Sequence, residues 1–166
     1  MTPDLEALLH ALAASGLRFV VIGGVAVGVH GYVRATRDLD VCPAGDRENL
    51  EVLARLLSEL DAEQLEVGDF APGELPFDPR EADDLAEGGN FRLRTRLGAL
   101  DVMQWSPGFD AEQAFATLDA NAIQLDLDGS AIRVCSLEDL RIMKRTAGRP
   151  QDLVDLELLP QSGDRP

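Results

Sequence analysis

The sequence predicts an α/β (α+β) fold in which a mixed β-sheet is flanked by helices and followed by a helical C-terminal segment. Residues 17–22 are nearly all apolar, which is typical of a central strand. Residues 5–12 and 47–60 carry leucines at helical spacing, as expected of helices with one buried face. Residues 91–104 and 122–134 each contain two short strand-like stretches around a turn, the pattern of a β-hairpin.

Shorter elements complete the predicted fold. A short helix is expected at 25–30, after a Gly-Gly turn, and a strand at 38–42 that ends at a proline. A further helix is expected at 110–118. Two helices then end the chain, one from Ser136 to about residue 148 and one after Pro150.

The length and composition set the outer bounds. A chain of 166 residues can form one domain with its own hydrophobic core. We expect that domain at 1–160, with a polar tail at 161–166. No apolar run is long enough to cross a membrane and the N-terminus lacks the features of a signal peptide, so we expect a cytoplasmic protein with no membrane partner. Cys42 and Cys135 suit neither a disulfide framework nor a zinc site, and free thiols are expected.

The charges are unevenly distributed. The chain has 15 basic and 30 acidic side chains, a net charge of −15, which argues against broad nonspecific binding to nucleic acid. Residues 66–89 combine acids with prolines and glycines, which predicts an insert-like acidic loop with a short helix near 81–86. Residues 133–149 hold five basic against two acidic side chains, a net +3, which indicates either a local anionic ligand or a solvated helix face.

Two aspartates on one predicted strand carry the chemistry. Asp38 and Asp40 are separated by one residue, so on a strand both carboxylates project from the same face. Their repulsion is relieved by a cation, and Mg²⁺ binds through one or two carboxylates plus substrate phosphates. The preceding Gly23-Gly24 turn lets backbone N–H groups approach a phosphate closely. The pattern therefore predicts a site for a nucleotide and Mg²⁺ (or Mn²⁺).

This pattern resembles the nucleotidyltransferases of the DNA polymerase β superfamily, whose signature is a Gly-Gly or Gly-Ser turn followed by Asp-x-Asp on a strand. Here thirteen residues separate Gly23-Gly24 from Asp38-Leu39-Asp40. The longer phrase GGVAVGVHGYVRATRDLD, which ends at Asp40, looks like the AbiEii-type minimal nucleotidyltransferases. That group includes many toxin components of toxin–antitoxin pairs.

The resemblance implies transfer of a nucleoside monophosphate from a nucleoside triphosphate (NTP) to an acceptor hydroxyl, with release of pyrophosphate. The acceptor would be the 3′ end of a tRNA or a protein hydroxyl, and a toxin would have a cognate antitoxin as its partner. The alternative is a small hydroxylated antibiotic such as an aminoglycoside or a lincosamide. A non-catalytic binding or regulatory protein on the same fold is a further alternative, against which the complete set of aspartates counts.

A third carboxylate is expected because phosphoryl transfer uses metals that clamp the attacking and leaving oxygens. Asp101 fits, since it is a charged residue inside an otherwise apolar strand, although an outward-facing position on an edge strand is the alternative. The resemblance implies the same assignment, since the superfamily places its third aspartate on a later strand. The expected catalytic and metal-binding residues are Asp38, Asp40 and Asp101, and the expected nucleotide-binding residues are Gly23, Gly24, Arg34, Thr36 and Lys144.

Several of these assignments have alternatives. Arg34 could hold a phosphate or form an ion pair with an acid, and Thr36 could simply end its loop. Lys144 can reach a triphosphate as a mobile point charge. Arginines that alternate on the predicted strand 91–96 share one face, which indicates either an anion-binding rim or a solvated strand face; they are Arg92, Arg94 and Arg96.

Two other pairs of aspartates are interpreted as structural. Asp126-Leu127-Asp128 repeats the Asp-x-Asp spacing, but Asp128-Gly129 is typical of a hairpin turn, so this stretch is expected in a hairpin arm. Asp152 and Asp155 follow Pro150 at the start of the last helix, where acids are favoured by the helix dipole. We expect them to be scaffold residues and not metal ligands.

Overall fold

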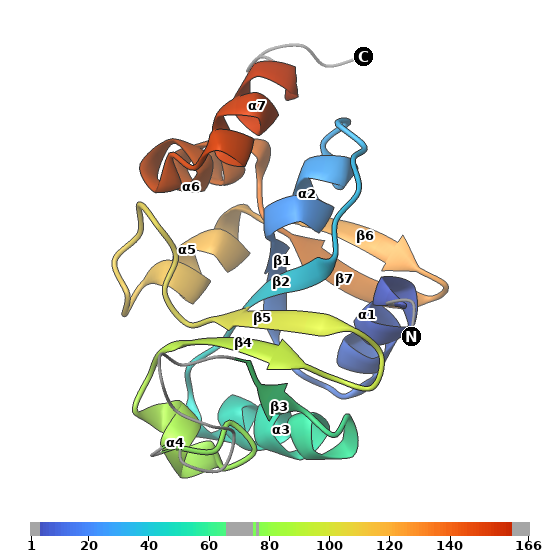
Figure 1. Ribbon diagram of the computed structural model, residues 1–166, viewed down its shortest axis with the longest axis vertical. Coiled ribbons are helices and arrows are strands. Elements are labelled where there is room, and N and C mark those ends of the chain that lie inside the picture. The colour runs from blue at the N-terminus through green and yellow to red at the C-terminus, as the bar shows by residue number, and fades with distance from the viewer. Residues whose placement is uncertain (1–3, 66–74, 76, 161–166) are drawn as a thin grey trace.

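The computed structural model describes residues 4–65, 75 and 77–160, and these form a seven-stranded mixed sheet flanked by helices, as the sequence predicts (Figure 1). In chain order the elements are α1 (Leu5–Ala14), β1 (Phe19–Ile22), α2 (Gly23–Val29), β2 (Asp38–Pro43), α3 (Arg47–Glu59), β3 (Glu63–Gln64), α4 (Ala82–Ala86), β4 (Asn90–Arg94), β5 (Ala99–Met103), α5 (Ala114–Asn121), β6 (Ile123–Leu127), β7 (Ser130–Val134), α6 (Leu137–Ala147) and α7 (Pro150–Leu158).

The strand order in the sheet is β3-β4-β5-β2-β1-β7-β6. The four middle strands form two parallel pairs that run in opposite directions, because β2 runs parallel to β5, β1 runs parallel to β7, and β1 and β2 are antiparallel. The pairs β4–β5 and β6–β7 are the two antiparallel hairpins expected from the sequence. The sheet therefore joins two hairpins through a central pair of strands, and the predicted Asp-x-Asp strand is in that centre.

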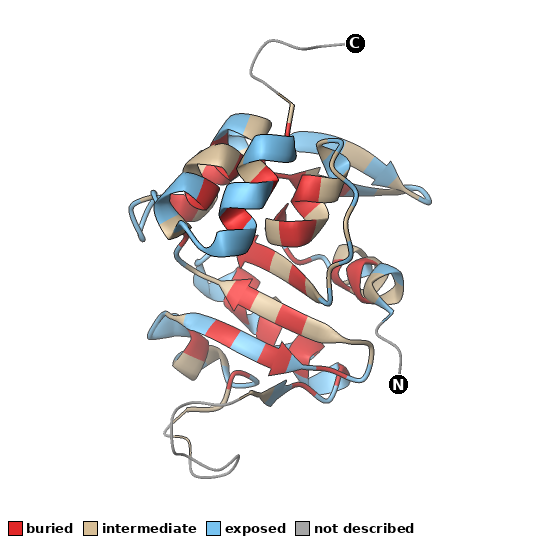
Figure 2. Cartoon of the chain, turned by 45° about the horizontal axis from the view of Figure 1, so that its top comes forward, coloured by how far each residue is buried: buried red, intermediate tan, exposed pale blue. Residues whose placement is uncertain are grey.

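The core lies along the central strands and the leucine faces of the helices. All four residues of β1 are buried, as expected of an apolar central strand. Helix α1 buries Leu8, Leu9 and Leu12, and α3 buries the leucines of its inward face. Figure 2 shows buried residues alternating with exposed ones along β4, in line with its residues Asn90–Arg94, of which Phe91 and Leu93 are buried. This alternation leaves one face of β4 free for polar side chains.

The helices at the two ends of the molecule differ in what they contact. Helices α6 and α7 pack on each other and lie next to α2 at the upper end in Figure 1. Helices α3 and α4 pack together at the opposite end, beside β3 and β4. The region between α6–α7 and the strands β2 and β5 is where the predicted site residues meet.

The structure departs from the sequence-based expectations in a few local features. Helix α5 begins at Ala114 and not at residue 110, because the Asp110 carboxylate accepts a hydrogen bond from the backbone N–H of Glu112 and forms a turn there. The edge strand β3 was not expected. In the predicted acidic loop 66–89, residues 66–74 and 76 lie outside the described residues. The remainder contains α4, near the expected short helix, whose Leu85 is fully buried.

Two further expectations concern the cysteines and the membrane. Both Cys42 and Cys135 are buried free thiols, as expected. Burial raises the pKa of each thiol to about 12, so both stay protonated at neutral pH. Within the part of the chain that the structure describes, no helix combines the length and the apolar character needed to cross a membrane.

Candidate active site

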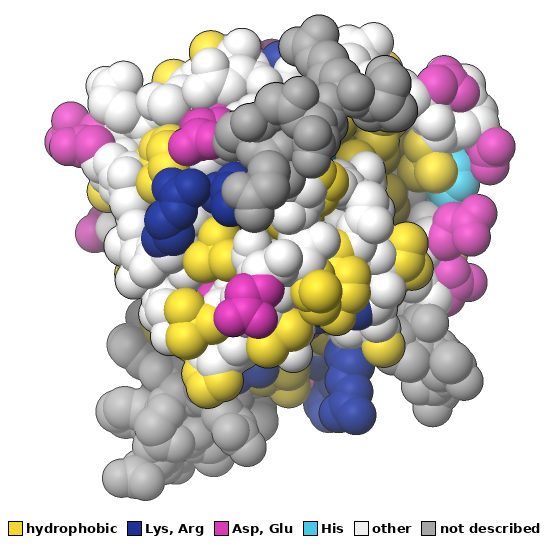
Figure 3. All heavy atoms as spheres, turned by 90° about the horizontal axis from the view of Figure 1, so that it is seen from above, with side chains coloured by type: hydrophobic (Ala, Val, Ile, Leu, Met, Phe, Trp, Pro, Cys, Tyr) yellow, Lys and Arg dark blue, Asp and Glu magenta, His cyan; other side chains and the backbone are white. Residues whose placement is uncertain are grey.

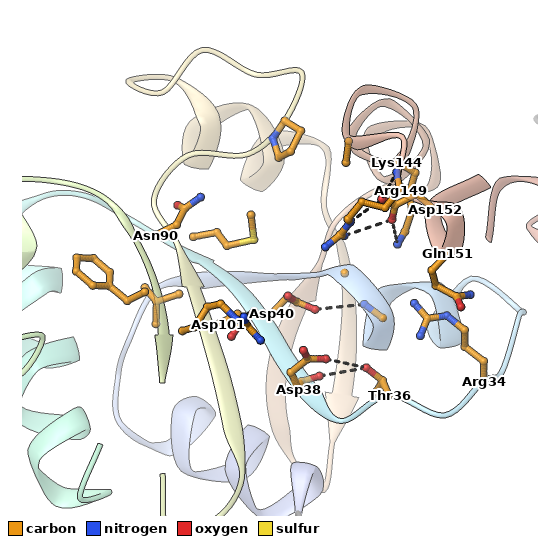
Figure 4. A pocket seen from close by; sticks show the side chains of 18 of the residues that line it. Arg34, Thr36, Asp38, Asp40, Asn90, Asp101, Lys144, Arg149, Gln151 and Asp152 are labelled. Carbon is orange, nitrogen blue, oxygen red and sulfur yellow. Dashed lines mark hydrogen bonds and ion pairs between the residues drawn. The ribbon is translucent and has the colours of Figure 1, made fainter. Parts of the chain in front are cut away.

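The sheet register brings the three predicted carboxylates together. Asp38 and Asp40 lie on β2, and Asp40 is directly opposite Asp101 on the parallel neighbour β5. Side chains that are opposite each other on adjacent strands share a face, so all three carboxylates project into the same space. Figure 4 shows them side by side beneath the α6–α7 segment. Each side chain is half-buried.

The carboxylates line a cavity of about 830 Å³, and the other five predicted residues line it too. These five are Gly23, Gly24, Arg34, Thr36 and Lys144. The cavity is also lined by residues that were not among the predicted site residues, including Asn90, Met103, Arg149 and Gln151. The structure thus gathers every predicted site residue around one cavity, from four separate segments of the chain.

The Gly23-Gly24 turn is fitted tightly against the aspartates. Gly23 has a positive φ of 63°, which favours glycine, and a Cβ at this position would lie 2.0 Å from Asp40 Oδ2. A Cβ on Gly24 would lie 2.5 Å from Thr36 Oγ1. The backbone N–H of Gly24 donates to Asp40 Oδ2 over 3.4 Å. Both glycines are therefore needed for the close approach of α2 to β2.

Burial and neighbouring negative charge destabilise the charged forms of Asp40 and Asp101. Burial raises the pKa of Asp40 to about 6, and the negative charges of Asp38 and Asp101 add to the effect. Burial and the charge of Asp38 also raise the pKa of Asp101. The hydrogen bond from Gly24 and the positive charge of Lys144 oppose the shift at Asp40 only in part. The three clustered carboxylates consequently concentrate negative charge in one part of the cavity, which a cation would relieve.

This donor set fits a hard divalent cation. The lining aspartates offer oxygen ligands, which Mg²⁺ and Mn²⁺ prefer. Burial and then repulsion by Asp38 and Asp101 raise the pKa of Asp40, and such an ion would offset the repulsion. Elsewhere in the described residues, Glu6, His10 and Asp128 place one ligand atom each within 4.8 Å of one another. That group is on the molecular surface, on α1 and the β6–β7 turn, and the cavity residues do not include it.

Lys144 is held in a buried ion pair. Its Nζ lies 2.8 Å from Asp152 Oδ1 and 2.7 Å from Asp155 Oδ2, and its side chain is only 5% exposed. Sequence reasoning treated Lys144 as a mobile charge, whereas the structure fixes its ammonium group between two carboxylates of α7. Lys144 thus lies at the wall of the cavity and links α6 to α7.

Arg34 is fixed to one of the same two acids, Asp155. Its Nε and Nη2 donate to the two oxygens of Asp155 over 2.8 and 3.0 Å, a bidentate pair. Burial alone would raise the pKa of Asp155, but hydrogen bonds from Arg34, Lys144 and Gln151 outweigh it and lower the pKa to about 2. Asp152 and Asp155 are therefore paired with cations, as expected of scaffold acids. Asp155 ties α7 to the loop before β2, and Asp152 ties it to α6.

Arg149 is a cavity residue that belongs to the basic stretch 133–149 but was not among the predicted site residues. Its Nε donates to Asp152 Oδ2 over 2.8 Å, yet its side chain is 74% exposed and remains accessible from the cavity. The hydrogen bond with Asp152 raises the pKa of Arg149, and the negative charges of Asp40 and Asp38 add to this. Arg149 lies in the Gly-Arg-Pro turn between two helices and is close to Lys144 in the sequence. These two features could have indicated that it is a site residue.

The remaining candidates have separate environments. Thr36 Oγ1 lies 3.3 Å from Asp38 Oδ1, so Thr36 contacts the site through an aspartate. The second Asp-x-Asp is in the β6–β7 hairpin, where Asp126 accepts from the backbone N–H of Gly129 and Asp128 has a positive φ of 49°, as expected of a turn. Of the three alternating arginines, Arg92 is opposite Asp101, Arg94 pairs with Glu63, and Arg96 lies beyond the end of β4.

Comparison with solved structures identifies the fold. The lincosamide antibiotic adenylyltransferase LnuA, in its lincomycin-bound crystal structure, aligns with 15% identity over 93% of this chain and 92% of that chain, with a TM-score of 0.58. A structure from Thermotoga maritima described as a nucleotidyltransferase aligns with 15% identity over 93% and 91% of the two chains, also with a TM-score of 0.58.

The antibiotic-resistance factor ANT(2″)-Ia aligns with 17% identity over 95% of this chain and 83% of that chain, with a TM-score of 0.58. No protein-family model and no curated protein matches the sequence. At these identities the likeness concerns the fold, and the chain has the nucleotidyltransferase fold.

The contact between Gly23 and Asp40 yields a stability prediction. Replacement of Gly23 by Ala should lower the free energy of unfolding by about 2 kcal/mol or more, because Cβ would clash with the Asp40 carboxylate at an unfavourable φ. Gly28→Ala is the matched control in the same helix. A Cβ there meets no atom within 4 Å, so this change should be neutral or stabilising. Urea unfolding of both variants measures the difference, and equal effects would contradict the prediction.

The raised pKa of Asp40 predicts a pH dependence of stability without metal. The pKa of this carboxyl rises from 3.8 in the unfolded chain to about 6 in the folded protein, so the folded protein binds the proton more tightly. The stability that this proton contributes is complete below pH 3.8 and is lost as the pH rises through 6. Asp40→Asn should therefore become more stable than wild type between pH 4 and pH 7, by on the order of 2 kcal/mol. Thermal unfolding in EDTA across this range measures the difference. A pH-independent difference would contradict the assignment.

The buried ion pair of Lys144 predicts a large loss of stability when it is broken. Lys144→Met should destabilise the protein by about 3 kcal/mol or more, because it leaves Asp152 and Asp155 short of a buried partner. Arg145→Ala, on the same helix, removes only an exposed pair with Glu138 and should cost less than about 1 kcal/mol. Chemical denaturation compares them. Similar values for the two variants would show that the Lys144 pair contributes little.

Proposed function

We propose that this chain is a metal-dependent nucleotidyltransferase, which moves a nucleoside monophosphate from an NTP to an acceptor hydroxyl and releases pyrophosphate. The observation that carries the proposal is the sheet register, which sets Asp40 opposite Asp101, two residues from Asp38, beside the Gly23-Gly24 turn. Three converging carboxylates next to a glycine turn suit a metal-bound triphosphate. The fold shared with adenylyltransferases supports the same reading.

The proposed roles follow from each residue's position. Asp38, Asp40 and Asp101 would hold Mg²⁺ or Mn²⁺, and a bound ion would stabilise the negative charge on the reacting phosphate oxygens. Asp101, on the neighbouring strand, would accept the proton of the acceptor hydroxyl, since it is a half-buried carboxylate that lies opposite Asp40 and lines the cavity. The acceptor oxygen bonds to the α-phosphorus as the bond to the bridging oxygen breaks, and pyrophosphate leaves.

The nucleotide would lie on the α2 and α6–α7 side of the cavity. Backbone N–H groups of the Gly23-Gly24 turn face the phosphates, and Thr36 orients Asp38 through its hydroxyl. Arg34 and Lys144 supply positive charge from the cavity wall while they remain paired with Asp155. Arg149 is the accessible cation on this side, and it has room to reach a phosphate oxygen.

The acceptor is proposed to be the 3′ end of a tRNA or a protein hydroxyl, with the chain acting as the toxin of a toxin–antitoxin pair. The alternative is a small antibiotic, as LnuA and the tobramycin complex of ANT(2″)-Ia illustrate for those proteins. Apart from the three aspartates, the described lining residues include one further acid, Asp152. Lys144 and Arg149 already neutralise its charge. A polycationic aminoglycoside would find few carboxylates for its ammonium groups.

The proposal is tested by incubating the protein with each labelled NTP and Mg²⁺ or Mn²⁺, in turn with total RNA, lysate protein, an aminoglycoside and a lincosamide. Label should pass to RNA or protein. Asp101→Asn should abolish the transfer, because it removes the proton acceptor and a metal ligand, and Asp38→Asn and Asp40→Asn should do the same.

The hairpin aspartates give the matched controls. Asp126→Asn and Asp128→Asn change the same residue type at the same spacing but lie outside the cavity, so activity should stay near that of wild type. Loss of transfer in these variants together with its retention in Asp101→Asn would place the active site elsewhere.

A further inference from the structure

A single row of the sheet register contains two carboxylates and one arginine. Ile22 on β1 is opposite Asp40 on β2, Asp40 is opposite Asp101 on β5, and Asp101 is opposite Arg92 on β4. Residues in one row of adjacent strands project from the same face about one strand spacing apart. The backbone itself therefore holds a positive side chain next to Asp101, on the side away from Asp40.

The ion pair between Arg92 and Asp101 is loose. Arg92 Nε lies 3.8 Å from Asp101 Oδ2, beyond hydrogen-bond distance, and the Arg92 side chain is 71% exposed against 20% for Asp101. A long, exposed side chain at this distance can leave without breaking any hydrogen bond. Its charge nevertheless counts, since two opposite charges 3.8 Å apart attract each other even where water partly screens them.

We propose that Arg92 is a counter-ion built into the sheet, which offsets the charge of Asp101 in the metal-free protein and competes with the divalent cation for that carboxylate. The inference rests on the proposed function, because it takes Asp101 as a metal ligand. Arg92 thereby reduces the repulsion among the three carboxylates in the metal-free protein, and it also lowers the affinity of the site for the metal ion. It moves aside when the ion arrives, and the loose geometry permits this.

The neighbouring cations do not have this position. Arg94 projects from the same face of β4 but is opposite Ala99 and pairs with Glu63. Arg149 approaches the carboxylates from the other side of the cavity, but its guanidinium is hydrogen-bonded to Asp152. Arg94 is therefore a matched control, since it has the same charge, strand and face and has a different partner.

The experiment is calorimetric titration of Mn²⁺ alone into wild type, Arg92→Ala, Arg92→Lys and Arg94→Ala. Removal of one positive charge beside a divalent ion should tighten binding by about three- to tenfold in Arg92→Ala. Arg92→Lys keeps the charge and should bind like wild type, and Arg94→Ala should stay within about twofold. Each titration is repeated with Asp128→Asn, which removes one ligand of the exposed group with Glu6 and His10.

Asp101→Asn completes the design. In that background the Arg92→Ala change should no longer tighten binding, because the carboxylate for which the ion and the arginine compete is gone. One outcome would overturn the counter-ion inference alone: Arg92→Ala binds Mn²⁺ no more tightly than wild type does, while Asp101→Asn weakens the binding by wild type. Mn²⁺ binding by wild type that Asp101→Asn leaves unchanged would instead overturn the proposed metal site, and this inference with it.

Discussion

The repulsion between three carboxylates on adjacent strands is the constraint around which the rest of the structure is organised. The parallel register of β2 and β5 makes the contact of Asp40 and Asp101 unavoidable, since no rearrangement of side chains can separate residues that the backbone sets opposite each other. Burial then raises the energy of the charged forms. Neighbouring elements offset this charge: the backbone N–H of Gly24 donates to Asp40, and Arg92 lies beside Asp101.

The α6–α7 segment stabilises the same region by an unusual arrangement. Helix α7 buries its acids, Asp152 and Asp155, against Lys144 and Arg34, while Leu153 is 53% exposed. Figure 3, which views the molecule from above, shows several hydrophobic side chains on the surface at this end of the molecule. The exposed hydrophobic residues of α7 are Leu153, Val154 and Leu158. A helix held by buried ion pairs depends on their geometry more than a leucine-packed helix would, so α7 fixes the positions of Lys144 and Arg34.

The parts of the molecule that the sequence predicts well are those with local signals. The apolar strand β1, the Gly-Gly turn and the Asp-x-Asp strand follow from residue type and spacing, and the lone charge of Asp101 in an apolar strand indicated an inward position. The face of α7 could not be predicted in this way, because its leucine spacing favours a buried Leu153. Only the three-dimensional arrangement brings Lys144 and Arg34 to the opposite face.

The same distinction applies to the site. Hydrophobic periodicity cannot reveal that Lys144 is paired or that Arg149 is accessible, since both depend on where α7 docks relative to the sheet. The pairing of Arg92 with Asp101 depends on the register of the β4–β5 hairpin, which the turn sets and the sequence indicates only approximately. Long-range partners of charged residues are thus the least predictable part of the molecule.

The charge balance of the cavity connects these features to the proposed chemistry. Among the described residues, four carboxylates and four cations line the cavity, so their charges balance within a chain of net charge −15. An NTP is strongly anionic and gains little from a neutral cavity, whereas its complex with divalent cations has lost most of its charge. In the proposed complex the three clustered carboxylates would face the metal, and Arg34, Lys144 and Arg149 on the α6–α7 side would face the phosphates. The placing of these charges, and not the total charge, would therefore favour a metal-bound nucleotide over a bare anion.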